Sequence, residues 1–527
     1  MSEFNLQSTI QSTISFLKNQ FITWYGLIFI SISLYFIILY IKRVIFRKKH
    51  GCEEPPIYPD GGFLGIKLGY DLQYYKKTGE LIDFPLKLYK KYGNIPTFSA
   101  YLFGVRVVVT IEPENLKALL ATQFNDFSLG TRHAHFAPLL GDGIFTLDGN
   151  GWKDSRAMLR PQFAREQIAH VQIIEPHLQI LKKHILKNKG KVFDIQELFF
   201  RLTVDTSTEF LFGESVHSLY DDSIGLKCDD QVAGFAEAFN EAQKSLAVRT
   251  YLQVLYFLYN PPSFWKNTKI VHNFAKTFVN KALSLTPEQL EKQEGYTFLY
   301  ELVKHTRNPI VLQDQLLNIL VAGRDTTAGL LSFCFFELSR HPEIWSKLKE
   351  EIYSNFGYGD NINLESITFE TLKKCNYLKW VLNETLRLYP SVPINFRVAT
   401  KDTTLPVGGG KNGQSPVFVG KGTTVAYSPY VLQRMENYYG KDAEEFKPER
   451  WENLGKLGWA YLPFNGGPRI CLGQQFALTE ASYVIVRLTQ MFPNLISGDS
   501  SPDPCRKLIH LTMSHMDGVF IKMDEKE

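Results

Sequence analysis

The sequence has 527 residues, a formal charge of +4 and a hydrophobic content of 44%. By length alone about three domains of roughly 150 residues each would be expected, and the apolar fraction is ample for a large core. The near balance of 58 basic and 54 acidic residues gives no reason to expect nucleic acid or another polyanion as a partner.

The first predicted element is an uncharged apolar run, residues 21–41. Its 21 residues are enough to cross a bilayer hydrocarbon core of about 30 Å. Trp24, Tyr25 and Tyr40 lie near its ends, where aromatic side chains favour the membrane interface. A cleaved signal peptide is the alternative, but the run is long, starts late and lacks a clear small-residue cleavage site. We therefore expect a transmembrane anchor over residues 21–41 after a short N-terminus, residues 1–20.

The charges around this run predict its orientation. Only Lys18 and the amino terminus are basic before the run. Five basic residues follow it closely: Lys42, Arg43, Arg47, Lys48 and Lys49. The positive-inside rule then places residues 1–20 in the lumen and everything after the anchor in the cytosol. The cysteines agree, because the six of them have no paired spacing and so indicate a reducing compartment: Cys52, Cys228, Cys334, Cys375, Cys471 and Cys505.

The basic and Pro/Gly-rich residues 42–65 read as a stiff linker, and no second linker follows. One large domain is therefore expected over residues 66–527. Within it, residues 96–111 predict a β-hairpin with its turn at residues 102–104, and residues 112–122 predict a short helix. Trp152 and Arg156 are four residues apart, so they share one helix face. Taken alone, that pair would more often belong to an ordinary surface helix.

Residues 173–290 are mostly amphipathic helix, and residues 311–340 predict one long buried helix. The middle of that helix, AGRDTTAG over residues 322–329, is small or polar, which core packing alone would not select. A local opening of the helix that accommodates a ligand and water explains this composition better.

Two further segments follow. Glu384 and Arg387, three residues apart on the next predicted helix, can pair on one face, and PERW at residues 448–451 comes much later. The glycine-rich stretch at residues 408–416 superficially suggests a phosphate-binding loop. However, Lys411 is followed by Asn412 and not by Ser or Thr, so a hairpin loop is expected.

The segment FNGGPRICLGQQFALTE, residues 464–480, holds a single cysteine, Cys471, just before a helical pattern. A cysteine at a helix N-terminus lies in a positive field, which lowers the pKa of its thiol and favours the thiolate that binds metal. The neighbouring glycines allow a flat group to approach the backbone closely. Because zinc wants three or four protein ligands at short spacings, one isolated thiolate favours haem. The alternative is a buried structural cysteine before a core helix.

The Cys471 segment resembles the haem-binding loop of the cytochrome P-450 family, F-x-x-G-x-R-x-C-x-G, at every fixed position: Phe464, Gly467, Arg469, Cys471 and Gly473. The family's W-x-x-x-R, A/G-G-x-D/E-T-T, E-x-x-R and P-E-R-W motifs also occur here in the family's order. The resemblance covers nearly the whole chain from about residue 66. It implies a mainly α fold with small β-sheets, preceded by the N-terminal transmembrane helix.

The resemblance implies that haem b is bound through the Cys471 thiolate and otherwise without a covalent bond. Many animal fatty-acid ω-hydroxylases carry a Glu that bonds to haem, and Ala322 stands at the matching place. By the same resemblance Phe464 packs near the sulfur and the loop glycines Gly467 and Gly473 belong to the haem site. The implied partners of the haem propionates are Trp152, Arg156, Arg397 and Arg469.

The family pattern also assigns the remaining site residues. Asp325 and Thr326 form the acid–alcohol pair that delivers protons to dioxygen, and Ala322 and Gly323 leave space above the haem. The substrate pocket is lined from a strand whose alternate side chains face the haem: Val392, Ile394 and Phe396. A structural lock behind the haem is formed by Glu384, Arg387 and Arg450.

Within the family, residues 316–333 and 464–484 are similar to the fungal alkane and fatty-acid hydroxylases of alkane-assimilating yeasts. This implies a monooxygenase that uses O2 to hydroxylate a long-chain n-alkane or fatty acid at its terminal methyl. The chain has no flavin or dinucleotide motif, so the implied electron donor is a separate NADPH–cytochrome reductase. The implied location is the endoplasmic reticulum membrane, with a single span and a cytosolic catalytic domain.

Three alternatives remain. The substrate could be another apolar molecule such as a sterol or xenobiotic. The chain could be a haem-thiolate isomerase or peroxide-driven oxidase, or a membrane haem sensor or carrier without turnover. The intact Asp325–Thr326 pair argues against the last two alternatives.

Overall fold

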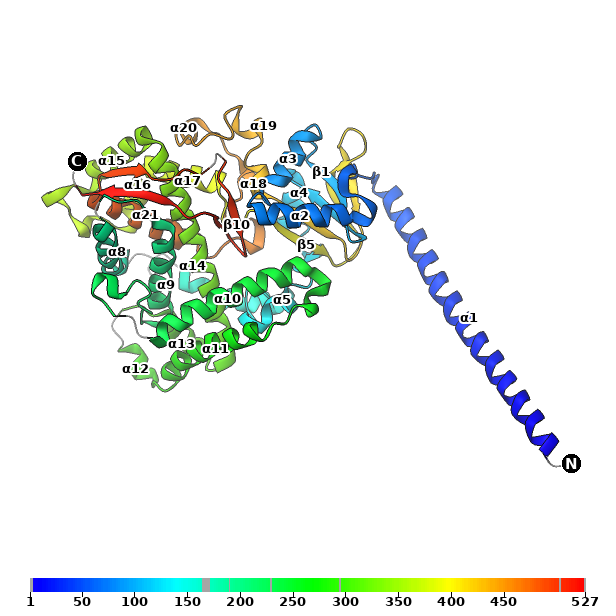
Figure 1. Cartoon of the computed structure of the whole chain (residues 1–527). Helices are drawn as coiled ribbons and strands as arrows, with labels where there is room; N and C mark the ends of the chain where they lie inside the picture. Colours follow the sequence, from blue (N-terminus) through cyan, green and yellow to red (C-terminus); the bar gives the residue numbers. More distant parts are fainter. Residues whose placement is uncertain are drawn as a thin grey trace.

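The computed structural model describes residues 3–163, 171–188, 190–227, 230–292, 295–501 and 504–525. Its first helix, α1 (Glu3–Lys49), projects from the rest of the chain as a long rod (Figure 1). The stretch Trp24–Lys49 contains an 18-residue window with a mean hydropathy of 2.1, and this window is not buried by the rest of the chain. The predicted anchor, residues 21–41, therefore lies inside a longer helix that also includes most of the predicted N-terminal segment.

The base of α1 is fixed to the globular part. Arg43 pairs with Asp402 at 3.3 Å, and the rings of Phe46 and Phe418 lie 5.7 Å apart. These contacts hold the helix against the hairpin of β6 (Thr403–Gly409) and β7 (Ser415–Val419). The glycine-rich stretch at residues 408–416 forms the turn of this hairpin, as predicted.

The segment predicted as a linker, residues 42–65, differs from that prediction. Residues 42–49 continue α1, and Glu53 and Ile57 form bridges to β7 and to the first strand of the main sheet. Tyr58 is buried. The segment is therefore packed onto the globular part, because its backbone groups find hydrogen-bond partners there.

The main sheet has five strands in the order β1-β2-β8-β5-β3. Their bounds are β1 (Thr97–Leu102), β2 (Val105–Thr110), β8 (Thr424–Tyr427), β5 (Asn395–Ala399) and β3 (Phe127–Ser128). The pair β1–β2 is the antiparallel hairpin predicted over residues 96–111. In the antiparallel pair β5–β8, Arg397 lies opposite Val425, which places Arg397 inside the sheet and not at its end.

Two smaller sheets lie near the C-terminus. One has the order β4-β12-β9, with β4 (Phe193–Asp194), β12 (Phe520–Asp524) and β9 (Asn494–Ser497). The other is the hairpin of β10 (Lys507–Ile509) and β11 (Met513–His515), whose tip is residues 510–512. The remaining α-helices that the structure describes are α2 (Ile66–Thr78), α3 (Asp83–Lys91), α4 (Pro113–Lys117), α5 (Arg132–Leu140), α6 (Gly149–Leu159), α8 (Glu175–Asn188), α9 (Ile195–Phe212), α10 (Asp230–Leu252), α11 (Pro262–Leu283), α12 (Pro287–Glu291), α13 (Phe298–His305), α14 (Pro309–Arg340), α15 (Pro342–Phe356), α16 (Phe369–Lys374), α17 (Asn376–Leu388), α18 (Pro429–Leu432), α19 (Glu436–Tyr439), α20 (Arg450–Asn453) and α21 (Gln474–Met491).

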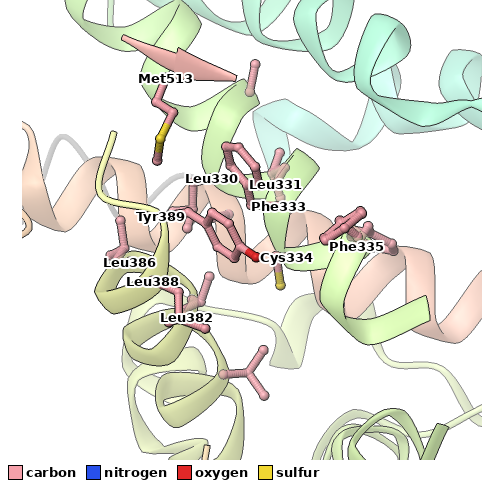
Figure 2. Packing of buried hydrophobic residues seen from close by; sticks show 14 of the residues in the cluster. Leu330, Leu331, Phe333, Cys334, Phe335, Leu382, Leu386, Leu388, Tyr389 and Met513 are labelled. Carbon is pink, nitrogen blue, oxygen red and sulfur yellow. The ribbon is translucent and has the colours of Figure 1, made fainter. Parts of the chain in front are cut away.

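The long helix α14 runs through the centre of the globular part (Figure 1) and packs against α9, α11, α17 and α21. Its C-terminal half lies in the largest apolar cluster. Figure 2 shows residues 330–335 of α14 against residues 382–389 at the end of α17, with Met513 of β11 beside them. The rings of Phe333 and Tyr389 stack 4.2 Å apart. Because this half is so densely packed, it holds the middle of α14 in a fixed position.

Candidate active site

Cys471 lies in the loop between the short helical turn Gly467–Arg469 and α21. Its backbone N–H donates to Phe464 O at 3.0 Å, which closes the loop. Gly467 has φ +67°, and a side chain there would meet Leu120 O at 1.9 Å, so the position requires glycine. Cys334, Cys375 and Cys505 are buried, whereas Cys471 is exposed. A structural cysteine before a core helix would be buried like the other three.

The electrostatics of this thiol differ from the prediction. Although its surface is accessible, Cys471 is closely surrounded by protein, and this desolvation raises the pKa of its thiol above the ordinary value. The Gly473 backbone N–H and the charge of Arg156 lower the pKa only in part. The sequence argument identified the lowering contributions but not the dominant desolvation. A metal cation reverses this balance, because a coordinating thiol loses its proton outright.

The surroundings of Cys471 are unlike a zinc site. Within the described ranges, no group of three or more His, Cys, Asp or Glu side chains is arranged to hold a metal ion. Leu472 packs into the same apolar cluster as Val321, so the cysteine loop and the middle of α14 border one region. A lone thiolate facing an apolar helix suits a flat, largely apolar metal complex.

Three predicted residues meet beside this loop. The Arg469 guanidinium lies 4.4 Å from the centre of the Trp152 ring, and that of Arg156 lies 5.8 Å from it. Arg469 donates to Leu147 O at 2.9 Å and to Asp148 Oδ1 at 2.7 Å. Trp152 is buried. The helix α6 and the cysteine loop, far apart in the sequence, are therefore joined through these side chains.

Arg397 and a residue that sequence reasoning missed complete the group. Arg397 is buried, its Nη1 donates to Phe396 O at 2.7 Å, and its Nε has no hydrogen-bond partner in the described part of the chain. Arg132 of α5 donates to Asn395 Oδ1 at 2.8 Å and lies 5.0 Å from the centre of the Phe396 ring. The available signal was one basic residue in a turn-rich, aromatic segment, residues 127–145, which alone does not identify a partner.

These guanidiniums repel one another. Burial is the largest cause that lowers the pKa of Arg132, to about 9, and Arg397 and Arg469 add to it. Burial likewise lowers the pKa of Arg469 to about 10, with Arg397 and Arg156 contributing and Asp148 opposing. Several partly buried cations around one carboxylate fit a ligand with two anionic groups. The two propionates of haem b meet this requirement, so the residues present fit that cofactor.

Asp325 and Thr326 lie on α14 four and five residues after Val321, which belongs to the apolar cluster that the cysteine loop borders. The Thr326 hydroxyl donates to Ala322 O at 2.7 Å, and Ser391 Oγ donates to Thr326 O at 3.3 Å. Asp325 Oδ1 lies 3.5 Å from Nε of the buried Arg324. α14 is continuous here, so the predicted opening of the helix is absent. The Thr326 hydroxyl instead shares the Ala322 carbonyl with the backbone of the helix.

The residues predicted to line the substrate pocket differ in their exposure and in the elements that carry them. Val392 and Ile394 are exposed by 38% and 39%, but they precede β5, so the predicted strand alternation begins only at Asn395. Phe396 faces Arg132. A side chain at Gly323 would extend toward Ser207 Oγ of α9, 3.3 Å away. This glycine therefore permits the close approach of α9 and α14, and its role in a pocket, like that of Ala322, stays a prediction.

The predicted lock is present as a contact network. Glu384 accepts hydrogen bonds from Arg387 Nε and Nη2, both at 2.8 Å, and from Arg450 Nε at 2.7 Å. Trp451 Nε1, which the sequence analysis did not assign, donates to Glu384 Oε2 at 2.9 Å. Glu384 and Arg387 are completely buried. Because every partner is satisfied, the network joins α17 firmly to α20.

Glu480 of α21 is a second residue that sequence reasoning missed. It is buried, accepts from Thr206 Oγ1 of α9 at 2.7 Å, and lies close to Thr327 of α14. Burial raises the pKa of Glu480 to about 7, against the lowering effect of the two threonine hydroxyls. A carboxyl group that titrates near neutral pH therefore lies behind the proposed proton-delivery segment.

Comparison with known proteins places the chain in one family. The family model described as Cytochrome P450 matches residues 59–518. Cytochrome P450 52A6 of Candida tropicalis is 59% identical over 525 residues, which cover 98% of this chain and 99% of that protein. Cytochrome P450 52A12 of Debaryomyces hansenii is 61% identical over 513 residues, with 96% and 98% covered. Cytochrome P450 52A3-A of Candida maltosa is 60% identical over 505 residues, with 94% and 96% covered.

Proposed function

The chain belongs to the cytochrome P450 family of haem monooxygenases, and from this premise we propose that it hydroxylates long-chain n-alkanes, fatty acids or both at the terminal methyl. The observation that carries the proposal is the exposed Cys471 beside a group of arginines that burial destabilises, of which Arg469 has an acidic partner, Asp148. This arrangement suits a dianionic metal complex and has no evident structural purpose without one.

Haem bound through the Cys471 thiolate supplies the activation of dioxygen, because the thiolate donates electron density that favours O–O cleavage. In the proposed site Arg132, Arg156, Arg397 and Arg469 hold the two propionates, and Trp152 braces Arg469. Phe464, which packs on the main core cluster, shields the sulfur. Gly467, with φ +67°, gives the loop its tight turn, and the backbone N–H of Gly473 would stabilise the thiolate.

The proposed proton donors are Asp325 and Thr326. The Thr326 hydroxyl, which donates to Ala322 O at 2.7 Å, would exchange this hydrogen bond for one to dioxygen when it delivers a proton. Asp325 replaces the proton that Thr326 gives up. The guanidinium of its neighbour Arg324, 3.5 Å away, limits the movement of the Asp325 carboxylate. The apolar surroundings exclude water, so the oxidant meets substrate and not solvent.

The N-terminal helix suggests a membrane anchor. We infer a single span in the endoplasmic reticulum with the catalytic domain in the cytosol, on the basis of the basic residues after the apolar run. Enzymes of this family generally take electrons from NADPH–cytochrome reductase, and we propose the same donor here. The ion pair Arg43–Asp402 supports a fixed angle between anchor and catalytic domain, which suits transfer between two anchored proteins.

The proposed substrate class is supported by identity of about 60% to the 52A proteins and by an apolar region beside α14. A sterol or xenobiotic would fit an apolar pocket of another shape, and a haem sensor would bind lipid without consuming NADPH.

The test is a reduced carbon-monoxide difference spectrum of the membrane-expressed protein, followed by titration with dodecane and lauric acid. We expect a thiolate-type Soret band, a low- to high-spin shift with at least one lipid, and terminal alcohol when reductase and NADPH are added. A thiolate band with no response to either lipid would contradict the substrate class. Lipid binding without NADPH consumption would favour the sensor.

A further inference from the structure

Arg249 lies in the last turn of α10, and its side chain is buried. Its guanidinium donates to two backbone carbonyls of α5, from Nη2 to Ala134 O at 3.0 Å and from Nε to His135 O at 3.2 Å. Burial lowers the pKa of this guanidinium, and no carboxylate among the described residues opposes that effect. The carbonyls of α5 therefore take the place that a counter-ion would occupy.

The first of these carbonyls is available because of a proline. In an α-helix the Ala134 carbonyl would accept from the backbone N–H of residue 138, four positions further on. That residue is Pro138, inside α5, and it has no N–H. Arg249 Nη2 therefore supplies the donor that α5 itself lacks. Because a carbonyl that loses its donor on folding costs free energy, this hydrogen bond ties α5 to α10.

Further hydrogen bonds join both helices to the segment between α10 and α11. Arg249 Nη1 donates to Asn260 Oδ1 at 2.7 Å and to Tyr259 O at 3.3 Å. His135 Nε2 lies 2.9 Å from Gln253 O, and since a carbonyl can only accept, this nitrogen carries the proton. One buried guanidinium and one imidazole thus hold α5 against α10 and against the segment that follows α10.

The turn of α5 that Arg249 holds also carries Arg132, the first residue of that helix. Arg132 donates to Asn395 Oδ1 at 2.8 Å, and the charges of Arg397 and Arg469 help to lower its pKa because the guanidiniums repel one another. The carbonyls that Arg249 holds come only two and three residues after Arg132. The repulsion acts to push the start of α5 away from the arginine group, and the hydrogen bonds from Arg249 oppose that movement.

We propose that Arg249 is a positioning residue that holds Arg132 in place for a haem propionate. It acts through the first turn of α5 and does not itself belong to the arginine group around Cys471. This inference rests on the proposed function, because it requires haem at that group, and it goes beyond it, because it makes haem retention depend on α10. Loss of Arg249 should loosen α5, so that Arg132 spends less time at the propionate.

The first experiment is a double-mutant cycle on haem release, measured on the full chain in nanodiscs by transfer to apomyoglobin. Arg249→Gln should speed release on the order of fivefold, as the loss of charged hydrogen bonds predicts. If Arg249 acts through Arg132, the same change in an Arg132→Gln background should speed release by less than about twofold, because effects of coupled residues do not add. Arg307→Gln is the matched control and should leave release unchanged. Its guanidinium also donates to a helix carbonyl, Leu283 O of α11 at 2.5 Å, but it is exposed.

The second experiment restores the missing donor. Pro138→Ala returns a backbone N–H that can donate to Ala134 O, so in that background Arg249→Gln should speed haem release only about twofold. Amide hydrogen exchange of residues 132–140 in the haem-free protein gives a readout that is independent of the cofactor. Exchange should be faster in Arg249→Gln than in the wild type, and it should return toward the wild-type rate when Pro138→Ala is added.

Two results would overturn the inference. An equal fold-increase of haem release in the wild-type and Arg132→Gln backgrounds would show that Arg249 supports haem independently of Arg132. Unchanged haem release in Arg249→Gln would show that it does not support haem at all. Should Arg249→Gln fail to fold, Arg249→Lys, which keeps the charge but has fewer donors, enters the same cycle under the same criteria. If the wild type binds no haem, the proposed function itself fails, and the hydrogen-exchange comparison still tests whether Arg249 holds α5.

Discussion

The guanidinium of Arg469 lies 4.4 Å from the centre of the Trp152 ring, and this contact joins the cysteine loop to α6. A cation on an indole face is stabilised, but the ring cannot neutralise its charge. Asp148, at 2.7 Å, is the acidic partner of Arg469, and it also accepts from Leu129 N at 2.9 Å. The arginine group around the loop therefore has more positive charge than the protein itself compensates.

Removal of one of these cations should separate cofactor binding from folding. We expect Arg132→Gln to lower haem retention on the order of tenfold, as the loss of one charged hydrogen bond predicts. The same change should stabilise the haem-free protein slightly, since it relieves repulsion with Arg397. Haem transfer to apomyoglobin and thermal unfolding measure the two effects. Lys153→Gln, an exposed change on α6, is the control. Loss of stability in the haem-free protein would show a structural role instead.

Replacement of the proposed ligand has a spectroscopic outcome. Cys471→Ala should abolish the thiolate-type Soret band of the reduced carbon-monoxide complex, while the far-ultraviolet circular dichroism stays near that of the wild type. Cys52→Ser removes another partly exposed thiol, remote in sequence from the loop, and should leave the band unchanged. A thiolate band that persists in Cys471→Ala would refute the ligand assignment.

The role of Thr326 can be separated from its place in the helix. Thr326→Ala should keep haem and lipid binding but divert electrons from product to peroxide or water, and the coupled fraction should fall about tenfold or more. Ser332→Ala is matched, because the Ser332 hydroxyl donates to Ala328 O at 2.6 Å in the same way, away from the site. NADPH consumed per alcohol formed is the measurement. An equal ratio of alcohol formed to NADPH consumed in the two variants would contradict a role of Thr326 in proton delivery.

The buried network around Glu384 predicts a stability effect without a specific effect on catalysis. Glu384→Gln leaves Arg387 and Arg450 with an uncharged partner, and breaking such a buried pair costs about 3–5 kcal/mol. We expect a lower midpoint of unfolding and poor haem incorporation at the growth temperature. The control, Glu452→Gln, changes an exposed carboxylate of the same α20 and should leave the midpoint in place. A wild-type midpoint in Glu384→Gln would contradict the structural assignment.

Several elements followed from sequence alone for physical reasons. The hairpin β1–β2, the helix α14 and the pairing of Glu384 with Arg387 depend on local periodicity or on short spacing. The position of Arg132 in the arginine group was not predicted, because its neighbours Asn395 and Phe396 belong to a strand that is distant in the sequence. The predicted direction of the Cys471 pKa shift was wrong. A helix N-terminus, which lowers the pKa, is visible in the sequence, whereas the desolvation that raises it depends on the whole fold.

Glu480 gives a pH dependence whose sign can be worked out. Its pKa in the folded protein is about 7, above the value of about 4.3 expected when unfolded. Between these values the folded protein binds more protons than the unfolded chain, so stability falls as pH rises from about 4.5 to 7. The shift corresponds to a loss of about 4 kcal/mol, and Glu480→Gln, which cannot ionise, should lack it. Chemical denaturation at pH 5 and pH 8 measures the difference. Glu350→Gln, an exposed change on α15, should keep the wild-type pH dependence. If Glu480→Gln also keeps it, the buried carboxyl is not the group that titrates.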